Sequence, residues 1–139
     1  MSRPEYYGNP AGLTQDIDVV RAIFAAFAAR DIEAMLAFVA PDCEIDLRGT
    51  AEIVGRREPY RGHAGMREYF ADVARTWEEL TLHATDFRAI PGAVVVMGYV
   101  DGRLGGEPFR RSAVWTWKLA GGKATHVRAT PTGPGPPAA

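Results

Sequence analysis

Tyr99 and Asp101 are the two residues whose types and spacing most clearly suggest chemistry, because they flank Val100 in an almost wholly apolar stretch. A carboxylate in apolar surroundings suits general acid–base catalysis, and a neighbouring phenol can donate a hydrogen bond. We therefore predict Asp101 as the catalytic acid or base and Tyr99 as the donor. The structural alternative is a salt bridge of Asp101 near the sheet edge, since Gly102 follows directly.

A turn of odd length at Gly105–Glu107 would place Asp101 opposite Arg111 in a pair of antiparallel strands. We prefer this register because it gathers apolar partners on one face. Arg111 would then orient a charged group of the ligand. The predicted ligand lining combines large side chains from several elements, namely Leu47, Phe70, Trp77, Met97 and Trp115. Trp115 is the preferred pocket residue, although a large aromatic residue on a strand can equally belong to the core.

His126 is a further candidate for the pocket, but two arguments about its orientation conflict. A two-residue turn at Gly121–Gly122 would pair it with Trp117 and bring it inside. The apolar alternation of Val127 and Ala129 would turn it outside instead. Both orientations stay open.

Metal, cofactor and redox chemistry have little support in the sequence. The histidines lack the short spacing of metal ligands, so we expect no metal at His63, His83 or His126. No glycine-rich nucleotide-binding motif is present, so we expect no cofactor. Cys43 is the single cysteine, which excludes an internal disulfide and is typical of a core residue in a reduced, cytoplasmic protein.

Hydrophobic periodicity predicts the elements that must position these residues. Three helices are expected in the first half, at residues 14–29, 31–40 and 62–77, with a strand at 43–47 and a loop or small hairpin at 49–61. Four strands follow, at residues 80–90, 93–101, 109–119 and 124–130. This order predicts an α+β fold in which three N-terminal helices lie over one face of a curved, mainly antiparallel sheet.

Length and composition are those of one globular domain. The chain has 139 residues, of which 47% are hydrophobic and 24% charged, and its net charge is −1. A nearly neutral charge argues against nucleic acid as a partner, and no apolar stretch suggests a membrane span or a signal peptide. We expect a leader at residues 1–13, the domain at 14–131 and a proline- and glycine-rich tail at 132–139.

Three short segments carry a resemblance to a known family. Arg30–Ala34 opens the second helix, Pro59–Met66 precedes the third, and Gly121–Lys123 forms the last hairpin. In these features the chain resembles the nuclear-transport-factor-2-like superfamily, and its SnoaL-like branch in particular. The resemblance implies a cone of curved sheet, often a homodimer packed sheet to sheet. Members include ketosteroid isomerases, polyketide cyclases, epoxide hydrolases, dehydratases and binding modules.

The chemistries of that superfamily fit this chain unequally. The ketosteroid isomerase base falls at Leu47, or at Asp46 in the other register, and its tyrosine and second acid are missing. The epoxide hydrolase motif reads Tyr99-Val100-Asp101, and its last-strand acid is replaced by Ala129. The polyketide cyclase pattern asks for one carboxylate in an apolar pocket, which Asp101 or Asp46 would supply.

The sequence therefore predicts a SnoaL-like protein that binds a small apolar or aromatic ligand. It would act as a cofactor-independent cyclase, isomerase, hydrolase or dehydratase by acid–base chemistry. The alternative is a non-catalytic ligand-binding or dimerisation module. A homodimer is expected in either case.

Overall fold

The computed structural model of the chain describes residues 10–134. Its helices are α1 (Pro10–Ala28), α2 (Ile32–Leu36), α3 (Arg48–Ile53) and α4 (Gly62–Thr76). Its strands are β1 (Val39–Leu47), β2 (Tyr60–Arg61), β3 (Glu79–Ile90), β4 (Ala93–Leu104), β5 (Glu107–Ala120) and β6 (Lys123–Pro134). Most of the expected elements are present, and the short helix α3 and the two-residue strand β2 fall where a loop or small hairpin was expected.

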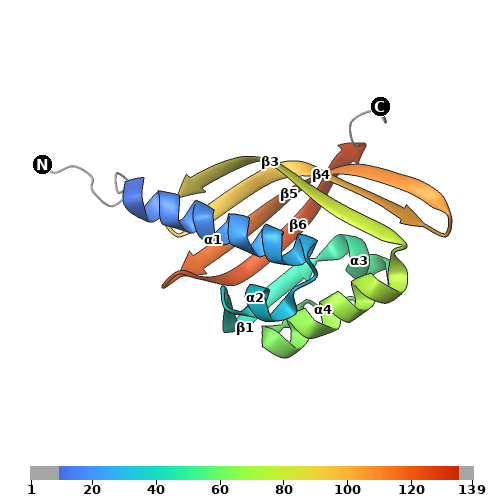
Figure 1. The fold of residues 1–139 in the computed structure, drawn as a ribbon, viewed down its shortest axis with the longest axis horizontal. Helices are drawn as coiled ribbons and strands as arrows, with labels where there is room; N and C mark the ends of the chain where they lie inside the picture. Colours follow the sequence, from blue (N-terminus) through green and yellow to red (C-terminus); the bar gives the residue numbers. More distant parts are fainter. Residues whose placement is uncertain (1–9, 135–139) are drawn as a thin grey trace, which may run out of the picture.

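The strands form one six-stranded sheet in the order β2-β1-β6-β5-β4-β3. β1 and β6 run parallel, and the other neighbours run antiparallel. The helices gather on one side of the curled sheet, with α1 running along it and α4 near β1 (Figure 1). We call this side the helix-covered face and the other the open face. The predicted α+β class with a mainly antiparallel curved sheet is confirmed.

The core lies between the helices and the helix-covered face. Trp115 and Trp117 of β5 are both buried there, and the ring of Phe24 from α1 meets them edge-on at 5.3 and 5.9 Å between ring centroids. Val96 of β4, fully buried, pairs with Trp115 across the sheet. Alternate residues of β4 and β5 therefore point into the core, and the intervening residues belong to the open face.

The turn between β4 and β5 contains two residues, Gly105 and Gly106, instead of the odd number expected. Their φ angles are +55° and +83°, and a two-residue hairpin turn of the I′ type requires such positive values at both positions. Asp101 therefore pairs with Arg110 and not with Arg111. The predicted register is wrong by one residue, and such a shift changes which residues share a face.

The orientation of His126 follows from an irregularity in the last hairpin. Gly121 and Gly122 do form the expected two-residue turn, but the register shifts between Lys118 and Leu119. His126 pairs with Lys118 and is exposed, while Val127 pairs with Trp117 and is 2% exposed. The apolar alternation thus outweighs the turn argument, and His126 lies outside the core.

The described elements extend beyond the predicted domain limits of 14–131 at both ends. α1 begins at Pro10, and proline is well tolerated at the start of a helix. β6 continues through Pro131 to Pro134, because its pairing with β1 ends at Ala129, opposite Leu47, and beyond that point it is an edge strand that tolerates proline. The rest of the expected leader and tail, residues 1–9 and 135–139, lies outside the described residues.

Candidate functional site

A cavity of about 300 Å³ opens between α3, the end of α4 and the helix-covered face of the sheet. Its inner wall is mostly apolar, with Leu47 from β1, Leu82 from β3, Val100 from β4 and Trp115 from β5. Trp77 and Phe109, the latter near the start of β5, add an aromatic pair whose rings meet edge-on with their centroids 5.1 Å apart. The cavity therefore offers flat, apolar surfaces to a ligand.

Three polar side chains join α3 to α4 along the cavity wall. The Trp77 indole Nε1 donates a hydrogen bond to Thr50 Oγ1 at 3.0 Å. Burial raises the pKa of Tyr69 to about 12, although a hydrogen bond with Thr50 and the charge of Arg30 act in the opposite direction. Tyr69 is therefore a neutral phenol at physiological pH. The contacts among Thr50, Tyr69 and Trp77 hold α3 against α4 and so fix this wall of the cavity.

Arg111 is the cation of the cavity lining, and it comes from β5 on the same side of the strand as Trp115. It is exposed, and within residues 10–134 it forms no ion pair. Glu52 of α3 lines the same cavity and is likewise exposed. A guanidinium without a carboxylate partner beside an apolar cavity is available to bind an anionic group of a ligand.

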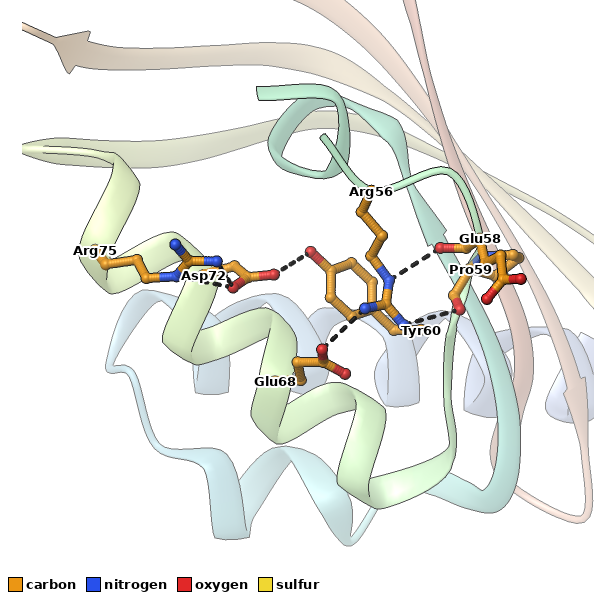
Figure 2. A network of polar contacts seen from close by, with 7 residues as sticks. All are labelled: Arg56, Glu58, Pro59, Tyr60, Glu68, Asp72 and Arg75. Atoms are coloured by element: carbon orange, nitrogen blue, oxygen red, sulfur yellow. Dashed lines mark hydrogen bonds and ion pairs between the residues drawn. The ribbon is translucent and has the colours of Figure 1, made fainter. Parts of the chain in front are cut away.

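A network of polar contacts anchors the segment that follows α3 (Figure 2). The Arg56 guanidinium donates to the carbonyl oxygens of Glu58 and Pro59, and to the Glu68 carboxylate of α4 at 2.9 Å. It also lies over the ring of Tyr60, 4.1 Å from the centroid. Because α3 contributes one wall of the cavity, the contacts of the segment that follows it help to hold this wall in place.

Asp72 is the buried end of the same network. It accepts a hydrogen bond from the Tyr60 hydroxyl at 2.7 Å and two from Arg75 at 2.7 and 3.0 Å (Figure 2). Burial alone would raise the pKa of Asp72, but the hydrogen bonds from Tyr60 and Arg75 outweigh it and hold that pKa below its usual value. Asp72 thus remains a carboxylate, and it acts as an anchor away from the cavity.

The structure brings four of the predicted ligand-binding residues together in the cavity, namely Leu47, Trp77, Arg111 and Trp115. Phe70 packs instead against Phe27 at 5.4 Å between ring centroids, behind the cavity wall. Arg111 lies on the cavity lining although the predicted register is wrong, because its position relative to Trp115 depends only on the alternation along β5.

Tyr99, Asp101 and Met97 lie on the open face, away from the cavity. Tyr99 stacks on His83 with ring centroids 4.3 Å apart. Asp101 accepts a hydrogen bond from Arg110 at 2.7 Å, and this bond holds the pKa of Asp101 below its usual value. The catalytic roles of Tyr99 and Asp101 stay predictions, and at this place they would act on a ligand of the open face.

Sequence reasoning missed Thr50, Tyr69 and Phe109 as cavity residues. Thr50 lies in α3, and a helix of six residues is too short to show a clear period. Tyr69 lies on the apolar face of α4, where the sequence pattern does not distinguish a ligand-facing phenol from a core residue. For Phe109 a signal did exist, because it alternates in phase with Arg111 and Trp115.

The remaining candidate chemistry has structural explanations. Cys43 is fully buried, and burial together with the charges of Asp42 and Glu44 raises its pKa to about 12. His63 Nε2 lies 2.7 Å from the carbonyl oxygen of Val39. Among residues 10–134, no cluster of His, Cys, Asp and Glu is arranged to hold a metal ion. No helix in that range has the length and apolar character to cross a membrane.

Comparison with known proteins places the chain among small α+β domains. The family model of the SnoaL-like domain matches residues 20–127. TerC, whose crystal structure was determined with polyporic acid, is similar to this chain. The two sequences are 28% identical, and the TM-score is 0.77 over 85% of this chain and 92% of that one. An NTF2-like protein of unknown function from Burkholderia pseudomallei is 22% identical, with a TM-score of 0.78 over 85% and 91% of the two chains.

A third similar structure is a protein from Xanthomonas campestris that has been assigned to the polyketide cyclases. It is 19% identical, with a TM-score of 0.72 over 84% of this chain and 90% of that one. A comparison with the curated proteins gave no significant match. The family model and these folds confirm the resemblance drawn from the sequence.

Proposed function

Because this chain is a small-molecule-binding protein of the SnoaL-like domain family, we propose that its ligand is a flat, mainly apolar organic acid. The ligand would lie in the cavity against Trp115, with its acid group on Arg111. The observation that carries this proposal is the position of Arg111 on the lining of an apolar, aromatic cavity, where its guanidinium forms no ion pair with any residue of 10–134.

The size and chemistry of the cavity suit such a ligand. Small-molecule sites commonly measure about 300 to 1,000 Å³ and combine apolar walls with a few polar groups. Here the walls come from Leu47, Trp77, Phe109 and Trp115. Aromatic rings pack well against flat apolar surfaces, so a ring system is favoured over a flexible chain.

The acid group is proposed from the charge of the lining. A guanidinium can hold a carboxylate or an enolate through two parallel hydrogen bonds, and no other side chain presents donors in that geometry. The structure of TerC with polyporic acid, from a protein 28% identical to this one, gives independent support for an acid as ligand.

Binding is the function that this geometry supports best. The acid–base reactions expected from the sequence require a proton acceptor at the ligand, and Asp101 lies on the opposite face of the sheet. Glu52 is the carboxylate among the described residues that line the cavity, and it is exposed at the rim. Our proposal therefore covers binding of the acid and leaves turnover aside.

The open face carries a proposal of its own, that two copies of the chain pair through it. A shallow groove lies there, lined by Met97, Tyr99 and Val114 among others. The ion pair of Asp101 with Arg110 and the stacking of Tyr99 on His83 order this surface in advance. The superfamily resemblance supports a second copy as the occupant.

Calorimetric titration with para-biphenylcarboxylate tests the ligand proposal, and the neutral alcohol para-biphenylmethanol serves as the comparison ligand. We expect Arg111→Leu to weaken binding of the carboxylate about 10- to 100-fold, the value of a hydrogen-bonded charge, and to leave the alcohol unaffected. Arg110→Leu is the matched control, because it removes the adjacent guanidinium on the open face. Equal losses in both variants, or no loss in Arg111→Leu, would refute the role of Arg111.

A further inference from the structure

A second, deeper chamber adjoins the cavity described above. Its volume is about 30 Å³, and its wall is formed largely by apolar side chains of α1, α2 and α4, including Ile23, Phe27, Met35 and Met66. The two spaces share the side chains of Leu47, Tyr69, Leu82 and Trp115. These four residues form the boundary between the outer cavity, which contains Arg111, and the inner chamber, which is apolar.

Trp117 lines the inner chamber, and its side chain carries an unusual polar atom. Its side chain is 4% exposed, and its Nε1 is the buried side-chain nitrogen or oxygen within residues 10–134 that has no hydrogen-bond partner. Trp77, by contrast, bonds its own indole nitrogen to Thr50. Buried indole nitrogens normally find an acceptor, and leaving one unpaired is costly.

We propose that the inner chamber is a second subsite, in which Trp117 Nε1 donates a hydrogen bond to a neutral oxygen at the far end of the ligand. This inference rests on the proposed function, because it assumes that Arg111 holds the acid group at the outer end. It assigns the ligand to a narrower class, elongated aromatic acids with a carbonyl group opposite the acid.

The oxygen must be neutral because nothing in the inner chamber would compensate a charge. The lining side chains carry no formal charge, and their polar atoms are the indole nitrogens of Trp115 and Trp117 and the hydroxyl of Tyr69, so an ion placed there would lose its hydration. An indole N–H can only donate, so the ligand must supply an acceptor. A space of roughly 10 to 15 Å³ is enough to hold one water molecule, so the chamber admits a group of the size of a carbonyl oxygen.

The two anchors also set the length of the ligand. Arg111 and Trp117 lie on the same side of β5, and their α-carbons are about 20 Å apart at 3.4 Å per residue. The Arg111 side chain covers part of this distance by reaching along the strand. The remainder corresponds to a ligand of two linked rings, longer than a single benzoate.

Two isosteric ligands test the subsite on the intact protein. One is para-biphenylcarboxylate with an acetyl group at the far para position, and the other carries an isopropenyl group there. They differ in a carbonyl oxygen against a methylene group. We expect the wild-type protein to bind the acetyl compound about 10-fold more tightly. In Trp117→Phe the ratio of the two affinities should fall to about one.

Nuclear magnetic resonance gives a readout that does not depend on the variant's folding. The indole N–H signals of Trp117 and Trp77 are followed in the wild-type protein, and only that of Trp117 should shift downfield with the acetyl compound. Equal affinities without such a shift would overturn the subsite, even where para-biphenylcarboxylate still binds through Arg111. Failure of all three carboxylates to bind would overturn the proposed function as well.

Discussion

The two faces of the sheet differ in whether their charged side chains form ion pairs. On the open face, Arg110 forms an ion pair with Asp101 at 2.7 Å, and Asp46 lies near both Arg48 and Arg128. One residue further along β5, Arg111 turns to the helix-covered side and lies against the cavity without an ion pair in the described chain. The arginine on the open face is thus neutralised by a carboxylate, whereas the arginine on the helix-covered face is available to a ligand.

Adjacent residues of β5 therefore have different roles, because one arginine belongs to an ion pair of the fold and the next is placed to bind a ligand. On the helix-covered face, apolar side chains fill the space beneath α1, and the unfilled remainder forms the two chambers. On the open face, half-buried apolar residues such as Val95 and Met97 share the surface with the ion pair of Asp101 and Arg110. We therefore expect substitutions on the two faces to differ in kind, and adjacent residues of the same strand give the sharpest comparison.

The largest contrast in stability is expected between Val96 and Val95, adjacent valines of β4. Val96 is fully buried, whereas Val95 is half-buried on the open face. Val96→Ala should lower the free energy of unfolding by about 2 to 3 kcal/mol, through lost burial and an unfilled cavity. Val95→Ala should cost less than about 1 kcal/mol, mainly through reduced strand propensity.

Urea unfolding of both variants measures this contrast under identical conditions. Similar losses at the two positions would mean that the open face is as well covered as the core. That outcome would contradict the distinction between the faces, unless both losses grew with protein concentration as association predicts.

Much of this division of faces was predictable from the sequence. Helices, strands and the position of Arg111 relative to Trp115 follow from periodicities of three to four residues and of two residues. The faces of Asp101 and Tyr99 were not predictable, because they depend on whether the turn at Gly105 holds two residues or three. Both turns satisfy the glycine pattern, and only the conformation decides between them.

The same reasoning explains what was missed in the cavity. Tyr69 and Thr50 come together only when α3 packs beside α4, and no local pattern reports a contact between segments so far apart. His126 shows the reverse case, in which the alternation at Val127 indicated the correct face and the turn rule did not. The turn rule fails because the register shifts at a bulge near Lys118, and bulges carry little sequence signal.

A smaller effect on stability, with a characteristic dependence on pH, is expected for the two hydrogen-bonded carboxylates Asp72 and Asp101. Asp72 is buried beside Tyr60 and Arg75, whereas Asp101 is exposed to solvent at more than a third of its side-chain surface. Asp72→Asn should cost about 1.5 to 2 kcal/mol at neutral pH, because hydrogen bonds to a buried charge are lost. Asp101→Asn should cost less, since solvent screens its pair.

The direction with pH follows from the lowered pKa of Asp72. Its contribution to the free energy of unfolding is fully present above the unfolded-state value of about 4 and is lost as pH falls through the lower folded-state pKa. Urea midpoints of the wild-type protein and Asp72→Asn should therefore converge as the pH falls below about 4. A difference that stays constant below a pH of about 4 would show that the carboxylate charge contributes nothing.

The smallest change in fold stability, with a change in assembly instead, is expected for Met97→Glu on the open face. Met97 lines the shallow groove through which we propose that two copies pair. A carboxylate there would lose its hydration on association and face its own copy across the interface, so association should fail while the monomer remains folded. Light scattering should give twice the monomer mass of 15.1 kDa for the wild-type protein and the monomer mass for the variant.

Ile53→Glu is the matched control, because it places the same charge at an exposed apolar residue of α3, on the other side of the sheet from the groove. It should leave the mass at that of two copies. Binding of para-biphenylcarboxylate should change less than about twofold in Met97→Glu, since the cavity lies on the other face and such a ratio is worth under 0.5 kcal/mol. A wild-type mass of one copy would refute pairing, and a loss of binding together with pairing would mean that the two faces are coupled.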